Sequence, residues 1–338
     1  MIKEFSFLRV VLISIIFLHH IGVYQGGGAI AVCCFFILSG FCSAISYKDK
    51  VISPHFNYLK YILSRCVKYY PVHWLTLILF IFLLQGGALG SLKYFMVNAS
   101  LLQSWIPQMS VYFSYNAVSW YLCNTIFFVA VLPIILKLLV KQSNRILIFL
   151  GAGLIVSYLC IFIFIPEEYY HSILYINPLT RLLDFTLGLM GGVIYSRKAY
   201  KMSQHTNIIL GTISFFVLII ISLLVPSKLL SVSIIFWCPS LMLVCSFANL
   251  RGAIPFINIQ FFALLGKCSF AFYMLHLIVI QFGKKCVTNI GFETSSLFFL
   301  VIFILTWIFS IFVQYFYTNP IIQWIQTIIN RLFTSARS

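Results

Sequence analysis

The sequence predicts an all-α polytopic membrane protein, with about ten transmembrane helices in one bundle and both termini cytoplasmic. Its 338 residues are 62% hydrophobic and 8% charged, whereas soluble globular proteins carry about 25% charged residues. Its apolar runs approach the roughly 20 residues that a helix needs to cross a bilayer. The runs are apolar at successive positions, which disfavours a membrane β-barrel because barrel strands alternate apolar and polar residues.

The apolar runs place ten spans in a single membrane domain, 1–338, with no separate soluble domain, because no linker or internal repeat divides the chain. The spans lie near residues 6–24, 28–46, 72–89, 118–140, 146–165, 173–195, 207–226, 230–249, 262–282 and 295–318. A signal peptide cleaved after Ala31 is the alternative interpretation of the first run. Arg9 disfavours it, because this residue interrupts the apolar segment.

The formal net charge of +16 would suggest nucleic acid as a partner of a soluble chain, but here the basic residues border the apolar runs and no nucleic-acid partner is expected. With the N-terminus inside, 16 of the 22 Lys and Arg residues fall on the cytoplasmic side, as the positive-inside rule requires. They are Lys3, Arg9, Lys48, Lys50, Lys60, Arg65, Lys68, Lys137, Lys141, Arg145, Arg197, Lys198, Lys201, Arg251, Arg331 and Arg337. The external side holds Lys93, Lys228, Lys284 and Lys285, of which the last two are an awkward pair.

Two connecting segments are longer than turns. In the first, 47–71, residues 56–70 have apolar positions at helical spacing opposite Lys60, Ser64, Arg65 and Lys68, which predicts an amphipathic helix on the cytoplasmic interface. The second, 90–117, is expected to be an external interfacial or re-entrant segment. The ten cysteines include no C-x-x-C pair, so neither disulfides nor a metal site is expected.

Ionisable residues within spans are costly, so each invites a functional explanation. Arg9 and His20 are 11 residues apart on the first span, which places them within about 20° of one helix face and about 16 Å apart along the axis. Their structural alternatives are a boundary anchor for Arg9 and a packing role for one of His19 and His20.

The remaining polar groups lie in later spans. Arg181 and Asp184 share a helix face at i, i+3, where they can form an ion pair that is either functional or purely structural. Tyr273 and His276 share the same spacing, and Asn124 lies within the fourth span. With the predicted topology, these five residues and His20 fall in the outer half of the membrane.

Arg9, Arg65 and Lys68 gather at the cytoplasmic end instead. A cationic inner pole suits the phosphates of a cytoplasmic donor, because Arg and Lys bind phosphate. A histidine at the outer pole suits removal of a proton from an acceptor hydroxyl. The sequence contains no P-loop, dinucleotide-binding, zinc-protease or serine-hydrolase motif.

Several motifs, in order along most of the chain, carry a family resemblance. They are Phe7-Leu-Arg9 with His20, Phe35-Phe-Ile-Leu-Ser39-Gly40-Phe, Arg65-Cys-Val-Lys68-Tyr-Tyr-Pro71, Ser119-Trp120-Tyr-Leu122, Pro178 to Gly188, and Leu265-Gly266-Lys-Cys-Ser269-Phe-Ala-Phe-Tyr273-Met-Leu-His276. The ordered set resembles the acyltransferase 3 family of bacterial membrane acyltransferases. The resemblance implies an inner-membrane enzyme that moves an acyl group, commonly acetyl, from cytoplasmic acyl-coenzyme A to a hydroxyl of an envelope carbohydrate. Lipopolysaccharide, O-antigen and exopolysaccharide, in some cases lipid-linked, are the implied acceptors.

By position, Arg9 and His20 match the family's essential Arg and His, and Arg65 and Lys68 match its R-x-x-R. Lys68 keeps the charge of the second Arg but loses its bidentate geometry. Asn124 or Thr125 stands where many members carry a Glu. Two alternatives follow: Asp184 assists the base in its place, or His20 acts without such help. Substrate contacts are expected from Ser39, Asn124, Arg181, Tyr273 and His276.

The mechanistic hypothesis is that Arg9, Arg65 and Lys68 hold the coenzyme A phosphates while His20 deprotonates the sugar hydroxyl. In a variant of it, His20 carries the acyl group transiently. The alternatives from other classes are a transporter or flippase of lipid-linked sugars, which also needs intramembrane charges, and a scaffold or sensor subunit, which does not need them.

Overall fold

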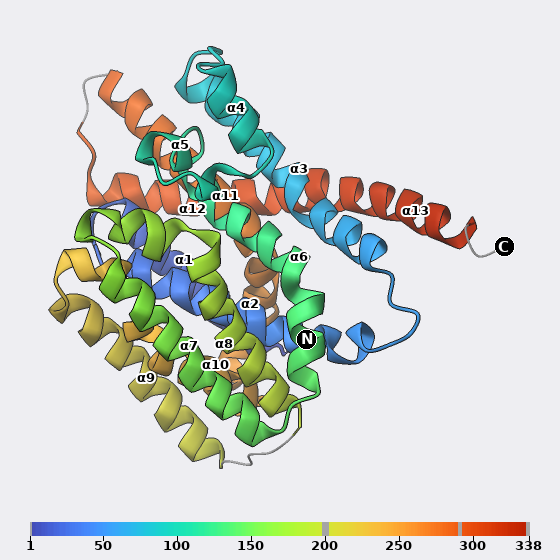
Figure 1. Cartoon of the computed structure of the whole chain (residues 1–338). Helices are drawn as coiled ribbons and strands as arrows, with labels where there is room; N and C mark the ends of the chain where they lie inside the picture. The colour runs from blue at the N-terminus through green and yellow to red at the C-terminus, as the bar shows by residue number, and fades with distance from the viewer. Residues whose placement is uncertain (1, 198–202, 290–292, 336–338) are drawn as a thin grey trace. The chain divides into compact units, whose positions relative to one another are not determined.

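The computed structural model describes residues 2–197, 203–289 and 293–335, and within these ranges all regular secondary structure is helical (Figure 1). Lys198, Lys201 and Arg337, three of the cations assigned to the cytoplasmic side, lie outside the described residues. The chain divides into two compact units, Met1–Phe56 with Ala130–Gly266 and Asn57–Val129 with Lys267–Ser338. The single membrane domain expected from the sequence stays a prediction.

The first unit is built mainly from six long helices. They are α1 (Glu4–His20), α2 (Gly27–Val51), α7 (Asn144–Phe164), α8 (Pro178–Ser196), α9 (Gln204–Leu224) and α10 (Ile234–Asn249). Some of them are connected by the short 3-10 helices η3 (Glu167–Tyr169), η5 (Ser227–Ser231) and η6 (Pro255–Asn258) and by the π-helix η4 (Tyr170–Ile176). The helices α6 (Trp120–Val140) and α11 (Gln260–Asn289) contribute residues to both units.

The pair α2 and α8 forms the centre of the first unit, with the most extensive contact between any two elements. Glycines permit it: a Cβ on Gly40 would overlap the carbonyl oxygen of Phe185, and a Cβ on Gly188 would overlap that of Ile37. Small residues at a helix crossing let two backbones approach closely, which is a common way to associate helices in lipid. Close packing of α2 against α8 therefore explains why Gly40, which follows Ser39 in the family motif, is a glycine.

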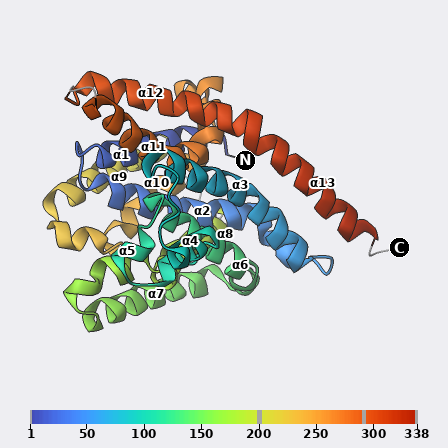
Figure 2. The same cartoon turned by 90° about the horizontal axis from the view of Figure 1, so that it is seen from above.

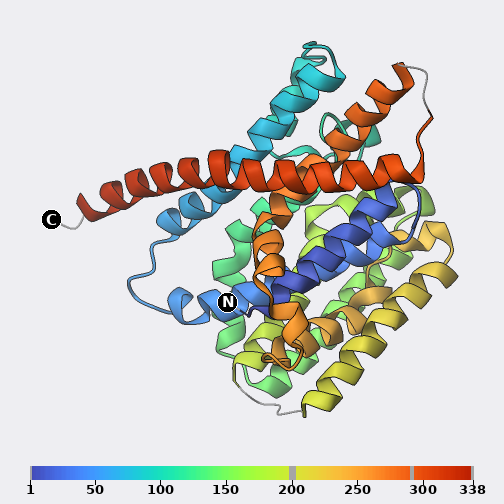
Figure 3. The same ribbon diagram turned by 180° about the vertical axis from the view of Figure 1, so that it is seen from behind.

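The other helices of the first unit surround this pair. Figure 3 shows α1 running beside α2, and the Phe5 and Phe41 rings of the two helices meet edge to face at 5.9 Å. The helix α9 packs on α10, where Gly211 faces Ser246. Most of the other side of α9 is exposed and apolar, including Ile213 and Phe216. Such a surface is what a helix presents to lipid.

The second unit contains α3 (Tyr58–Leu84), α4 (Leu92–Ala99), α5 (Met109–Tyr112), α12 (Ser296–Phe312) and α13 (Asn319–Ser335), with η1 (Gln103–Trp105), η2 (Ala117–Ser119) and η7 (Val313–Thr318). Figure 2 shows α12 continuing through η7 into α13 as one long rod. α13 packs along α3, where Gln326 donates a hydrogen bond of 3.0 Å to Ser64.

The expected interfacial helix at 56–70 is wrong as a separate element, because α3 runs without a break from Tyr58 to Leu84 with Pro71 inside it. The first part of α3 is apolar on one face and the rest is apolar on all faces. This change in pattern therefore indicates different surroundings along one helix and not a helix boundary. Proline is tolerated in membrane helices, where local adjustments satisfy the freed carbonyl. The tenth span also ends later than expected, since its helix continues into α13.

The segment 90–117 folds into short helices without a span, as expected. Tyr115 has a positive φ of 54° and donates a hydrogen bond to the carbonyl of Leu89, which closes the segment onto the residue that precedes it. Burial raises the pKa of the Tyr115 phenol, so this donor keeps its proton.

Seven helical stretches of the described residues are long and apolar enough to cross a membrane, counting α12 to α13 as one. Each of the ten expected spans corresponds to a helix, but α1, α8 and α10 are not among these seven. The chain is thus a helical multi-pass protein, and the count of ten spans and the cytoplasmic termini stay predictions. Lys284 and Lys285, the pair that fits the predicted topology poorly, have partners within the second unit: Lys285 donates to the Leu83 carbonyl at the end of α3, and Lys284 lies over the Phe299 ring.

We predict that Gly188→Ala lowers the free energy of unfolding by about 1–3 kcal/mol or more, because the added Cβ forces α2 and α8 apart. Gly153→Ala in α7 is the matched control, since no atom lies within 4 Å of the added Cβ. Thermal unfolding of the purified variants in one detergent measures both. Equal loss in the two variants would contradict close packing at Gly188.

Candidate functional site

A buried ion pair lies near the start of α8. Asn177 caps the helix by accepting a hydrogen bond of 2.9 Å from the Leu179 N–H, and Pro178 occupies the first turn, where its missing N–H costs nothing. This start places Arg181 and Asp184 on one face, three residues apart. Their nearest side-chain atoms, Nη1 and Oδ2, are 3.0 Å apart, and both side chains are 0% exposed. The ion pair expected from the i, i+3 spacing is confirmed.

Partners from other helices of the first unit hold the Asp184 carboxylate. Its Oδ1 atom accepts hydrogen bonds from the Ser233 hydroxyl at 2.7 Å and from the Trp237 indole N–H. The backbone N–H of Ser233 in turn donates to the Tyr158 hydroxyl of α7 at 2.8 Å. The carboxylate therefore links α8 to the start of α10 and, through Ser233, to α7. Charged hydrogen bonds of this kind are among the stronger ones, because both the charge and the low dielectric favour them.

Aromatic rings flank the Arg181 guanidinium. Its central carbon lies 5.0 Å from the Phe36 ring of α2 and 5.3 Å from the Tyr175 ring of η4. A cation over an aromatic face is stabilised by the ring's quadrupole, the more so when water is excluded. The Nε and Nη2 atoms of Arg181 are buried without a hydrogen-bond acceptor among the described residues. These donors fit either an oxygen-rich substrate group or a packing role, and in this conformation the guanidinium is closed to solvent.

The residues expected at the two ends of α1 lie on one helix but not in contact. Arg9 is half-buried in the second turn, within electrostatic reach of Cys42 of α2. His20 is the last residue of α1 and also half-buried, which a spacing of 11 residues puts about 16 Å from Arg9 along the axis. The neighbouring His19 ring lies against Gly28 and meets the His20 ring at 5.0 Å. Ser39 is half-buried in α2, directly before the glycine of the α8 crossing.

The second unit holds the other expected residues. On α3, Arg65 is half-buried with its guanidinium 6.0 Å from the Tyr61 ring, and Lys68 is exposed. Asn124 is fully buried in α6. On α11, His276 is fully buried, with its Nδ1 atom 2.6 Å from the Tyr273 carbonyl oxygen. The Tyr273 hydroxyl donates to the Val118 carbonyl at 2.9 Å, which leaves a structural role open for this residue.

Sequence reasoning missed five residues of the buried centre, which are Phe36, Tyr158, Tyr175, Ser233 and Trp237. Each lies in an apolar run of the expected kind, and about 50 residues separate Asp184 from its partners Ser233 and Trp237. No local signal joins such positions. Among the described residues, no three His, Cys, Asp or Glu side chains are grouped as metal ligands would be.

The helices and the polar residues within them define a helical multi-pass membrane protein with buried charges. A family model described as an acyltransferase domain (Acyl_transf_3) matches residues 2–315. The chain belongs to the acyltransferase 3 family. It is also 28% identical to acyltransferase MdmB from Streptomyces mycarofaciens, over 76% of this chain and 70% of that protein. No solved structure matches the chain.

We predict that Asp184→Ala lowers the free energy of unfolding by about 3–5 kcal/mol, because it leaves the Arg181 charge buried without its partner. The double variant Arg181→Met/Asp184→Leu removes both charges and recovers much of this stability. Thermal unfolding of the purified proteins makes the comparison. A double variant no more stable than Asp184→Ala would contradict a charge-pairing role.

Proposed function

We propose that the protein is a membrane O-acyltransferase of the bacterial inner membrane, which moves an acyl group from cytoplasmic acyl-coenzyme A to a hydroxyl of an envelope carbohydrate. The observation that carries the proposal is α1, a helix with Arg9 near its beginning and His20 at its end, in a chain of the acyltransferase 3 family. Acetyl is the proposed acyl group, as is common for the family that the motifs resemble. The family's name supports the acyl transfer itself. The coenzyme A donor and the carbohydrate acceptor are what the family resemblance implies, and the chemistry of the cations and the histidine is compatible with both.

The donor end of the proposal rests on cations. Coenzyme A carries phosphates, and guanidinium and ammonium groups are the protein groups that bind them. We assign this role to Arg9 in the first unit and to Arg65 and Lys68 in the second. Arg65 and Lys68 are one helical turn apart on α3, which places the two cations on one face of the helix, and Lys68 is exposed.

The acceptor end rests on histidine. The His20 imidazole takes the proton of the acceptor hydroxyl as its oxygen attacks the thioester carbonyl, the carbon–sulfur bond breaks, and the departing thiolate receives the proton. No metal is needed for this step, because the thiolate is a good leaving group. His20 is half-buried at the end of α1, which is compatible with contact to an acceptor.

Asp184 is proposed to support this chemistry from a distance. Its carboxylate is occupied by Arg181, Ser233 and Trp237 and is 0% exposed, which favours holding α8 and α10 in place over contact with substrate. Arg181 has free donors that suit a substrate oxygen, so its assignment to substrate binding is retained. The same assignment is retained for Ser39, Asn124, Tyr273 and His276.

We predict that His20→Ala abolishes acylation, with a loss of about 10²-fold or more, because the step loses its base. The measurement incubates membranes with radiolabelled acetyl-coenzyme A and counts alkali-labile label on the extracted glycan. His19→Ala is the matched control, since its ring packs on Gly28 beside the same helix end. Loss with His19→Ala but not His20→Ala would reverse the assignment, and absence of label with the native chain would favour a transporter.

We predict that Lys68→Gln raises the KM for acetyl-coenzyme A by roughly tenfold with little change in kcat, because a phosphate contact of this kind contributes to binding and not to the chemical step. Lys68→Arg is expected to lower the KM, since it restores a bidentate donor. Lys60→Gln, two turns earlier on α3, is the matched control. A KM that is unchanged in Lys68→Gln would remove Lys68 from the donor site.

A further inference from the structure

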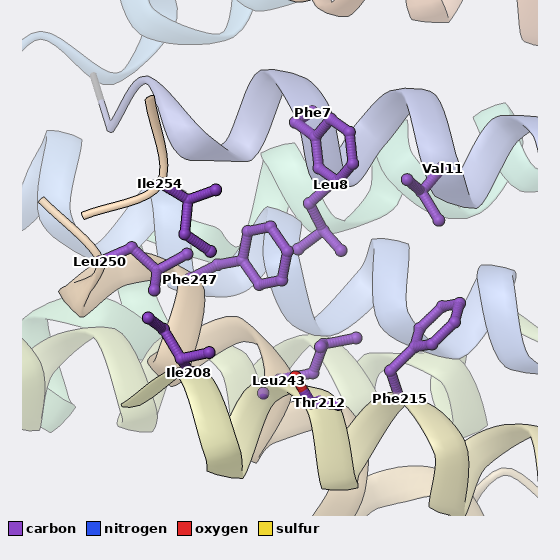
Figure 4. Close-up of a pocket in the computed structure, with 11 residues that line it drawn as sticks. Phe7, Leu8, Val11, Ile208, Thr212, Phe215, Leu243, Phe247, Leu250 and Ile254 are labelled. Atoms are coloured by element: carbon purple, nitrogen blue, oxygen red, sulfur yellow. The ribbon is translucent and has the colours of Figure 1, made fainter. Parts of the chain in front are cut away.

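An apolar groove lies in the first unit between α1, α9 and α10 (Figure 4). Its volume is about 260 Å³. Figure 4 shows Leu250, Ile254 and Ile208 at one end and Val11 and Phe215 at the other. Sites for whole small-molecule ligands are larger, at roughly 300–1,000 Å³. The groove therefore matches one segment of a hydrocarbon chain better than a coenzyme or a sugar.

The groove opens toward the surface of α9 that a bilayer would cover. Thr212 lines the groove and is exposed, and its neighbours Ile209, Ile213 and Phe216 are more than half exposed. An exposed apolar surface of this kind on a membrane helix faces lipid. A hydrocarbon chain can thus enter the groove sideways from the bilayer, without passing through water.

Cations stand at one end of the groove. Arg251 directly follows the lining residue Leu250 and is exposed, with a positive φ of 45°. The next residue, Gly252, donates its N–H to the Glu4 carboxylate at 2.8 Å, which fastens this loop to the start of α1. Lys3, also exposed, immediately precedes Glu4. The Glu4–Gly252 hydrogen bond therefore brings the backbones that carry Lys3 and Arg251 to the same end of the groove.

The acidic group at this end does not neutralise the two cations. Glu4 is 6% exposed, carries a single negative charge against the two cations, and its Oε1 atom already accepts from Gly252 and from the Asn258 amide. Lys3 and Arg251 are left facing solvent with a net positive charge. A ligand that matches both features is an amphiphile with an anionic head and an alkyl chain.

We propose that this groove binds one anionic phospholipid, with an acyl chain between α1, α9 and α10 and the phosphate at Lys3 and Arg251. The predicted topology places this end of all three helices at the cytoplasmic surface, so the lipid belongs to the cytoplasmic leaflet. α1 supplies Phe7, Leu8 and Val11 to the groove, and Arg9 lies between them in the chain. The lipid would thereby hold in place the helix to which the proposed chemistry is assigned, although the binding itself does not depend on that chemistry.

The test measures lipid retention by native mass spectrometry of the full chain, exchanged from detergent into phosphatidylglycerol or into phosphatidylcholine with the same acyl chains. We expect one retained phosphatidylglycerol and no retained phosphatidylcholine. Lys3→Gln/Arg251→Gln should weaken retention by roughly tenfold or more, since each cation contributes to binding an anionic head group. Lys48→Gln/Lys50→Gln, which removes the same charge at the end of α2, should leave retention unchanged.

A second pair of variants tests the groove itself. Val11→Trp and Thr212→Trp each fill it from a different helix, and thermal unfolding shows which of them folds. Retention should fall in the folded variants. Equal retention of phosphatidylcholine, or unchanged retention in Lys3→Gln/Arg251→Gln or in the filled variants, would overturn the proposal. Displacement of phosphatidylglycerol by palmitoyl-coenzyme A would also overturn it, because the donor's chain would then be the occupant.

Discussion

Hydrocarbon does not solvate charge, so a charged side chain inside the first unit needs partners from the protein itself. The packing of the first unit depends on how it provides them. The Arg181 guanidinium, which is 0% exposed, is paired with the Asp184 carboxylate and flanked by the rings of Phe36 and Tyr175. The same carboxylate accepts a hydrogen bond from Trp237, so this one ion pair contacts residues of η4, α2, α8 and α10. The glycine contact between α2 and α8 supplies the close packing that removes solvent from the pair. A substitution that disturbs the ion pair or the glycine contact would therefore weaken the other as well.

Most of the fold could be predicted because hydrophobicity along a membrane chain is a strong signal. Every expected span corresponds to a helix, and the expected ion pair formed because residues at i, i+3 share a face whatever surrounds them. Helix ends were predicted less well. The helix α3 continues through Pro71, and α12 continues through the π-helical segment η7 into α13, since local adjustments of the backbone let a membrane helix continue where its regular hydrogen bonds are interrupted.

The partners of the candidate site could not be predicted, because they are set by tertiary packing. Trp237 and Ser233 are residue types that occur commonly in membrane spans, and nothing near them in the sequence indicates the carboxylate that they bind. The groove was missed for the same reason: its lining combines α1 with α9 and α10, which lie about 200 residues later in the chain. In contrast, the spacing of Arg9 and His20 on α1 follows from sequence alone, since one continuous helix fixes it.

The central claim is that α1 presents a cation to the side of the donor and an imidazole to the side of the acceptor. The most direct measurement is the sidedness of the reaction in sealed membrane vesicles of known orientation. The account predicts that labelled acetyl-coenzyme A acylates the glycan when it is supplied at the cytoplasmic face, with label appearing on glycan inside inverted vesicles. Acylation that requires donor and acceptor on the same face of the membrane would contradict it.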